Sequence, residues 1–237
     1  MKRAAWIIVA LLVPLYAGTE TDPSVPTWLN RMRAGQGLSA LRVDPVLEGA
    51  AAEYAADLAE RGVLSHVDAL GRRALQRVRD HGGTAVLIGE ILGSGPDVQS
   101  VTSAWQQSIS HSEVAANPLW THYGAASVPH GQNRVWVVLF AGHRIYPLEI
   151  RGTADGYLVR GVLTAGDAEE PLLFSGLELL PLTNWDPSGR EFSFLIPTDR
   201  QSTYHRLGYR SQVGVLVITN TFYPQGIATS DRGREPR

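Results

Sequence analysis

The sequence predicts an α+β fold in which a helix-and-strand region is followed by a small all-β module. Apolar residues from Val25 to about Arg79 recur with the period of a helix. Two strand-like runs then close the first region, and beyond about Gly142 the helical period disappears. Helices that alternate with antiparallel strands are typical of the α+β class, and short strands alone indicate a sandwich or a barrel.

The strongest helix signal begins at Asp44-Pro45. An aspartate caps the free N–H groups of a helix, and proline suits the first helical position. Gly62 marks the end, because glycine readily adopts the left-handed conformation that follows many helices. Between these limits an apolar stripe recurs at helical spacing: Leu47, Ala51, Tyr54 and Leu58. The sequence therefore predicts a helix from about residue 45 to residue 62.

The remaining elements of the first region follow from caps and turns. A shorter helix begins at about residue 74 and ends before Gly82-Gly83. Asp97 caps another helix, whose stripe continues through Trp105 to Ser108, and Asn117-Pro118 forms a stop and turn. The strands expected in this region are Ala85–Leu92, Tyr123–Val128 and Arg134–Phe140.

The second region contains short strand-like runs separated by Gly, Pro, Asn and Asp. These runs are Tyr157–Leu163, Leu172–Leu180, Phe192–Ile196 and Val213–Thr219. We place a boundary near residue 145, which gives a first domain at 25–144 and a β-rich domain at 146–229. The alternative is that these strands extend the sheet of the first domain. The tail at 230–237 is rich in charge and glycine, and we expect it to be disordered.

The first 18 residues have the pattern of a secretory signal peptide. Lys2 and Arg3 precede a charge-free run, Ala4–Ala17, which is shorter than the roughly 20 apolar residues of a membrane span. Small residues then precede a polar segment. The alternative is an uncleaved anchor, because Leu15 and Tyr16 make a poor cleavage site. Either way we expect the folded part to be secreted, periplasmic or at the cell surface.

The composition excludes several classes of protein. The chain has 237 residues, 44% of them hydrophobic, with a net charge of −2 and no cysteine. That charge offers no bulk basicity to attract nucleic acid, and the charged fraction of 19% excludes a multi-span membrane protein. The absence of cysteine excludes disulfides, thiol catalysis and zinc–thiolate sites. The fold must therefore be stabilised by core packing.

A series of short matches in register resembles the bacterial branch of the CAP superfamily, whose domains are also called SCP-like. The matching segments are Leu29-Asn30, Gly37-Leu38, Asp44-Pro45, Ala50-Ala51-Ala52, Gly62 to His66, Gly89-Glu90, Trp105 to His111, Asn117-Pro118, Gly124 and Val135 to Phe140. The resemblance covers about residues 27–142. It implies an α-β-α sandwich with helices on both faces of an antiparallel sheet. Residues 143–237 resemble no family that we recognise.

The resemblance also implies a cleft with two histidines and acidic residues, in some members around a divalent metal. His66 corresponds to the first histidine, Glu90 to the first glutamate, and His111 to the histidine of the bacterial branch. The second glutamate has no counterpart, and Ser108 lies nearest its usual place. In a helix that continues past Trp105, Ser108 and His111 lie on one face.

Three chemistries are open to this set. His66, Glu90 and His111 form a ligand set for a divalent metal, zinc, magnesium or calcium, with an open position for water. Ser108 and His111 resemble a nucleophile–base pair, although a serine and histidine on one helix are seldom placed for attack. The third alternative is a hydrogen-bonded polar cluster that shapes the cleft. His122 precedes a strand and is a secondary candidate for the same cleft.

The leading hypothesis is an exported protein that binds a ligand or partner outside the cell through the CAP cleft without catalysis. The incomplete acidic set motivates it, and the resemblance implies lipid or sterol binding; peptide and cell-wall material are further candidates. One alternative is a metal-assisted, peptidase-like hydrolase that uses His66, Glu90 and His111. Another is an adhesion or scaffold protein that acts through residues 146–229. We expect no nucleic acid as partner.

Overall fold

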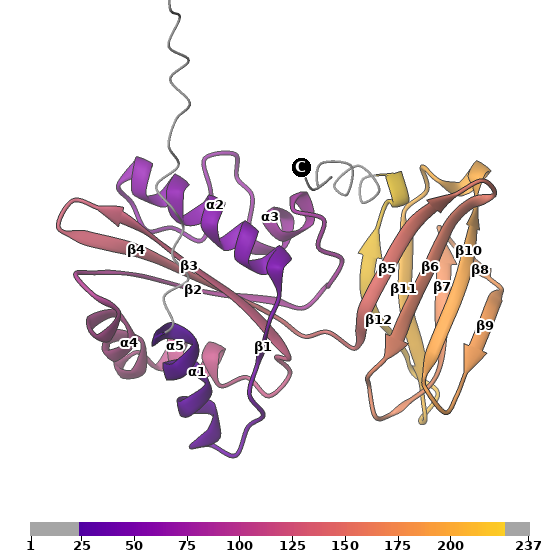
Figure 1. The fold of residues 1–237 in the computed structure, drawn as a ribbon, viewed down its shortest axis with the longest axis horizontal. Helices are drawn as coiled ribbons and strands as arrows, with labels where there is room; N and C mark the ends of the chain where they lie inside the picture. The colour runs from indigo at the N-terminus through magenta and orange to yellow at the C-terminus, as the bar shows by residue number, and fades with distance from the viewer. Residues whose placement is uncertain (1–23, 226–237) are drawn as a thin grey trace, which may run out of the picture.

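The computed structural model describes residues 24–225, so the predicted signal peptide and the tail at 230–237 lie outside the described residues. The first half of the described chain contains five α-helices and four strands; its helices are α1 (Ser24–Ala34), α2 (Pro45–Arg61), α3 (Ala74–Asp80), α4 (Val98–Gln107) and α5 (Ile109–Ala115). Its strands are β1 (Arg42–Val43), β2 (Ile88–Gly95), β3 (His122–His130) and β4 (Asn133–Ala141). Figure 1 shows this part beside an all-β part.

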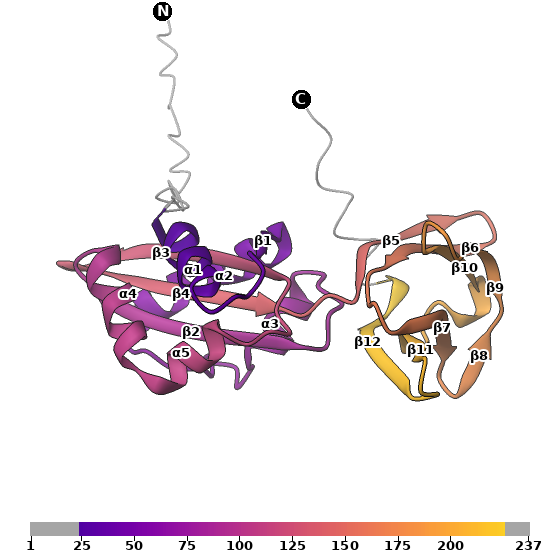
Figure 2. The same ribbon diagram turned by 90° about the horizontal axis from the view of Figure 1, so that it is seen from below.

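The four strands of the first half form one sheet with the order β1-β3-β4-β2. Strand β1 pairs with β3 in parallel over a short stretch, and the other pairs are antiparallel. Strand β2 is therefore an edge strand. Helices α2 and α3 cover one face, and α1, α4 and α5 cover the other (Figures 1 and 2). This is the α-β-α sandwich that the resemblance predicted.

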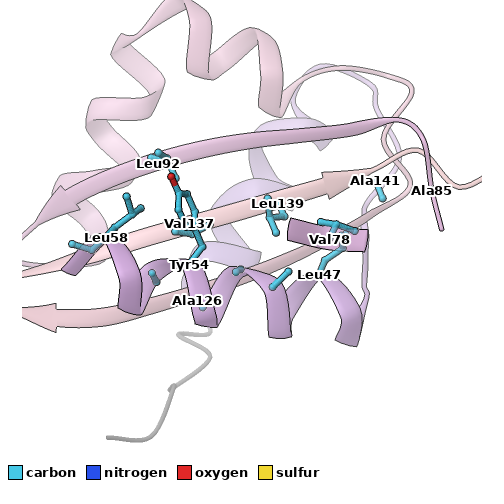
Figure 3. Packing of buried hydrophobic residues seen from close by; sticks show 14 residues of the cluster. Leu47, Tyr54, Leu58, Val78, Ala85, Leu92, Ala126, Val137, Leu139 and Ala141 are labelled. Atoms are coloured by element: carbon cyan, nitrogen blue, oxygen red, sulfur yellow. The ribbon is translucent and has the colours of Figure 1, made fainter. Parts of the chain in front are cut away.

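Helix α2 has the ends that the sequence predicted. The Asp44 carboxylate accepts a hydrogen bond from the Val46 N–H at 2.9 Å, and Gly62 ends the helix with a φ of 66°. Leu47, Tyr54 and Leu58 point from α2 towards β4, as Figure 3 shows. The helix also lies close to β3, where a Cβ on Gly124 would be only 2.2 Å from the Glu48 nitrogen. Only glycine permits this packing distance.

The opposite face of the sheet carries a second core that is richer in aromatic residues. Trp105 of α4 is buried, and its indole N–H donates to the Leu92 carbonyl at 2.7 Å. The rings of Trp28 and Trp105 lie 5.4 Å apart, so α1 is held against α4. Apolar residues of β2, β3 and β4 complete this core: Ile91, Tyr123, Trp136, Val138 and Phe140.

The second half of the described chain contains strands and one short 3-10 helix, η1 (Thr198–Arg200). Its strands are β5 (Ile145–Thr153), β6 (Gly156–Leu163), β7 (Ala168–Ser175), β8 (Glu178–Leu180), β9 (Leu182–Asp186), β10 (Glu191–Pro197), β11 (His205–Ser211) and β12 (Leu216–Phe222). They form two four-stranded sheets, β5-β6-β10-β9 and β12-β11-β7-β8. One apolar core draws residues from both sheets, so the all-β prediction is confirmed. That residues 146–229 fold alone stays a prediction.

The two halves are linked by backbone pairing as well as by the chain. Ala85 forms an isolated bridge with Asn220, so residues 84–86 extend the edge of β12. The Val86 N–H donates to the Thr219 carbonyl at 3.1 Å, and the Thr221 N–H donates to the Thr84 carbonyl at 2.8 Å. The strand predicted at Ala85–Leu92 is consequently shifted, because β2 begins only at Ile88. No helix among residues 24–225 has the length and apolar character that a bilayer span requires.

Candidate functional site

His66 and Glu90 meet at the free edge of the first sheet. The His66 Nδ1 lies 2.7 Å from Glu90 Oε1, so the predicted proximity of these two residues is present in the structure. Glu90 alternates on β2 with Ile88 and Leu92, which belong to the core beneath α2, and its side chain is only 4% exposed. The His66 side chain is 54% exposed. The pair thus joins a buried carboxylate to an imidazole that faces solvent.

Arg77 of α3 is a central residue of this site that the sequence reasoning missed. Its Nη2 donates to Glu90 Oε2 at 2.5 Å, and both side chains are about 5% exposed. The guanidinium lies 3.4 Å from the centroid of the Tyr54 ring, and its Nη1 donates to the Arg72 carbonyl at 2.7 Å. Arg77 lies between the apolar residues of a short amphipathic helix, and this position is the sequence signal that could have identified it. An arginine buried at such a position requires a partner.

The loop that carries His66 is held by its own hydrogen bonds. Asp68 accepts from the N–H groups of Leu70 and Arg72 at 2.9 and 2.8 Å, and from Arg72 Nε at 2.7 Å. The Tyr54 hydroxyl donates to the Ser65 carbonyl. His66 is therefore presented from an ordered turn, anchored on both sides, rather than from an unsupported loop.

Ser108 and His111 form the second half of the site. The predicted continuous helix is wrong here: α4 ends at Gln107, and Ser108 is extended, with φ −93° and ψ 118°. The break is stabilised because the Ser112 hydroxyl donates to the carbonyls of the last turn of α4, at 3.0 Å to Trp105 and 3.1 Å to Gln106. Ser108 Oγ nevertheless lies 2.8 Å from His111 Nδ1. Burial, and then the charge of nearby His66, lower the pKa of His111.

The predicted three-residue metal set does not fit this geometry. Within residues 24–225, no group of three or more His, Cys, Asp or Glu side chains is arranged to hold a metal ion. Both Glu90 oxygens have partners, His66 and Arg77, so in this structure Glu90 orients the His66 ring. The Nδ1 atoms of His66 and His111 are also engaged. Their Nε2 atoms have no partner among the described residues and are the donors that a metal could use.

The structure places His122 in a different cluster. Its ring lies 4.7 Å from that of His143 and 4.1 Å from that of Tyr146, on the side of α2 where Asp44 caps the helix. His143 Nε2 lies 2.8 Å from Asp44 Oδ2, and Thr121 Oγ1 lies 2.9 Å from His122 Nδ1. His122 therefore lies apart from the His66–Glu90 pair, because its strand position directs it towards the start of α2 and β5.

The buried environment of this cluster changes its acid–base chemistry. Burial lowers the pKa of His122 to about 4; His143 and Arg42 act in the same direction, and Asp44 opposes them. Burial raises the pKa of Asp44, but the hydrogen bond and charge of His143, together with the backbone hydrogen bonds from Val46 and Leu47, outweigh it, and the net shift is downward. His122 is therefore neutral in the folded protein near pH 7.

A groove of about 940 Å³ lies between α1 and α4. Its walls include the apolar side chains of Trp28, Met32 and Val98, and Arg31, Gln99 and Gln106 lie among its polar lining residues. The indole N–H of Trp28 is buried and has no acceptor among residues 24–225. Helices α1 and α4 lie on the face of the sheet opposite to α2, so this groove is on the other side of the sheet from the Glu90 side chain.

Comparisons with known proteins agree with the resemblance. The model of the CAP family, the cysteine-rich secretory protein family, matches residues 28–140. An uncharacterized protein of Borreliella burgdorferi is 34% identical over 116 residues, which are 48% of this chain and 74% of that protein.

Two solved structures are also similar to this chain. An outer surface protein from Borrelia burgdorferi is 29% identical, with a TM-score of 0.48, over 51% of this chain and 90% of that one. An extracellular protein of Bacillus anthracis with an SCP domain is 18% identical, with a TM-score of 0.42, over 48% of this chain and 38% of that one. By the family match and the Borreliella relative, the chain belongs to the CAP (cysteine-rich secretory protein) family.

Proposed function

We propose that this protein is an exported member of the CAP family that binds an amphipathic ligand with an acyl chain, without catalysis. The observation that carries the proposal is the groove between α1 and α4. Its volume of about 940 Å³ is within the usual range of ligand sites. Export is supported by the basic start and charge-free run of residues 1–18.

The lining of the groove indicates how such a ligand would lie. Trp28, Met32 and Val98 offer apolar surface to an acyl chain, whose burial is favourable in proportion to its area. Arg31 lines the same groove and forms no ion pair among the described residues, so it is available to a carboxylate. The His66–Glu90 pair, held by Arg77, contains no hydroxyl or thiol nucleophile; the hydroxyl of this site is that of Ser108, which is hydrogen-bonded to His111.

Palmitate should bind the protein and displace a fluorescent fatty acid, followed through energy transfer from tryptophan. Ser103→Trp fills the groove, and we expect it to weaken palmitate binding by about tenfold or more. Ala104→Trp is the matched control, because Ala104 is exposed on the same helix outside the groove lining. Arg31→Ala should weaken binding of palmitate more than binding of hexadecanol. Equal effects of the two tryptophan variants would contradict the proposal.

A second candidate function is zinc binding by His66 and His111. Each ring has its Nδ1 engaged by an oxygen, which is the usual arrangement of a metal-ligating histidine, and leaves its Nε2 available. Nitrogen donors favour zinc over magnesium or calcium. Zinc bound there would act as a Lewis acid. Titration calorimetry with zinc chloride should show heat that disappears in His66→Ala and in His111→Ala. His130→Ala, at an exposed histidine, is the control, and unchanged heat in His66→Ala would exclude this site.

A further inference from the structure

The all-β half has a groove of about 380 Å³ on the outward face of the sheet β5-β6-β10-β9. The opposite face of this sheet carries the core row Ile150, Val159 and Phe194. Because side chains alternate along a strand, the neighbouring positions point away from the core. Figure 1 shows β5, β6 and β10 side by side, with β9 at the edge. The groove is thus formed by the strands of this sheet, whose β9–β10 register shifts next to the Ser193–Asn184 pair, and not by loops.

Strand register places polar side chains in one row across all four strands. Glu149 is opposite Arg160, Arg160 is opposite Ser193, and Ser193 is opposite Asn184. These four line the groove, together with Glu191 from the neighbouring row. Neighbouring strands are about 4.8 Å apart, so the row presents hydrogen-bonding groups at regular intervals.

The hydrogen-bonding capacity of this row is unused within the described chain. Arg160, Asn184, Glu191 and Ser193 make no side-chain hydrogen bond or ion pair with residues 24–225, and Glu149 has only Arg151 at 3.8 Å. On the other sheet, Arg210 is paired with Glu170, and Arg206 donates to the Gly176 carbonyl. The groove therefore brings together side-chain hydrogen-bond donors and acceptors that are available to a ligand.

We propose that this groove binds a neutral oligosaccharide. Guanidinium, carboxylate and carboxamide groups each present a pair of parallel hydrogen-bonding atoms, which matches adjacent hydroxyl groups on a sugar ring. Pro147 and Val162 line the same groove and offer apolar contact to the C–H groups of the ring. The two carboxylates disfavour a polyanion, and Arg160 between them disfavours a cationic peptide. The same density of polar groups disfavours an acyl chain.

The test uses the full chain and titration calorimetry with chitotetraose, cellotetraose and maltotetraose. At least one should bind with a Kd of about 1 mM or tighter. Arg160→Ala and Asn184→Ala should each weaken that binding by about tenfold, because each removes a pair of hydrogen bonds. Arg210→Ala is the matched control, as an exposed arginine on the other sheet, and should leave binding unchanged. Unfolding curves of the variants confirm that the fold is intact.

A heparin oligosaccharide and an oligolysine peptide complete the experiment, and we expect neither to bind at this face. Three results would overturn the proposal. The first is that none of the neutral saccharides binds. The second is that Arg160→Ala and Asn184→Ala leave the binding of the saccharide unchanged. The third is that one of the charged probes, and no neutral saccharide, binds at the groove. Because the groove is formed by β5, β6, β9 and β10 alone, loss of palmitate binding in the helical half has no bearing on these outcomes.

Discussion

Replacing Arg77 with methionine should lower the free energy of unfolding by about 3–5 kcal/mol, which is the usual cost of breaking a buried ion pair. Methionine keeps the apolar stem over the Tyr54 ring but leaves the Glu90 carboxylate, 4% exposed, without its main counter-charge. His66 remains as a partner, but it is half exposed and is charged only when protonated. Urea unfolding at pH 7, followed by circular dichroism, measures the loss.

Two further variants separate charge from packing. Arg61→Met removes the partly exposed pair with Asp57, at 2.6 Å, and should cost no more than about 1 kcal/mol because water screens it. Adding Glu90→Gln to Arg77→Met removes the uncompensated charge, so the double variant should recover most of the stability that the single variant loses. A single variant as mild as Arg61→Met would show that the pair is not buried in solution. A double variant as unstable as Arg77→Met would assign the effect to packing.

Arg77 is the part of this site that the sequence did not predict. The family resemblance pointed to His66 and Glu90, and the alternation of Ile88, Glu90 and Leu92 places the carboxylate on a buried face of β2. A carboxylate buried in this way requires a partner, but the alternation does not indicate which residue that partner is. The partner lies on α3, and only the packing of α3 against the edge strand brings Arg77 to the carboxylate. In the same way, His143 meets Asp44 across 99 positions of sequence.

The fold was predictable where local signals were strong. Asp44-Pro45 and Gly62 predicted α2 within one residue at its C-terminal end, because caps and glycine conformation act locally. The strands β5, β9 and β11 were missed: β5 contains Pro147 and charged residues, and β11 contains a glycine and two arginines. Such segments become strands through pairing with neighbours, which a single sequence does not reveal. The helix break at Ser108 was not predictable, because no glycine or proline lies near it in the sequence.

Acid should destabilise the protein through His122. The unfolded histidine titrates at its ordinary pKa of 6.5, whereas burial lowers the pKa in the folded state to about 4. Above pH 6.5 both states are neutral. Between pH 6.5 and about 4 only the unfolded state gains the proton, so stability falls as the pH falls, and below about 4 the decline stops. This difference between the pKa values of the unfolded and folded states corresponds to about 3 kcal/mol of stability for His122, which is 4% exposed.

Urea unfolding of the wild type and of His122→Phe between pH 7 and pH 4 isolates this contribution. Phenylalanine keeps a ring against Tyr146 but does not titrate, so the variant should lose about 3 kcal/mol less than the wild type over this range. Subtraction is needed because burial also lowers the pKa of His111 and of His205, and both histidines make the wild type and the variant less stable in acid. His130→Phe, at an exposed histidine, should follow the wild type. If the curves for the wild type and His122→Phe run parallel, then His122 is protonated in the folded state, and the cluster with Asp44, His143 and Tyr146 admits water that its burial in the structure excludes.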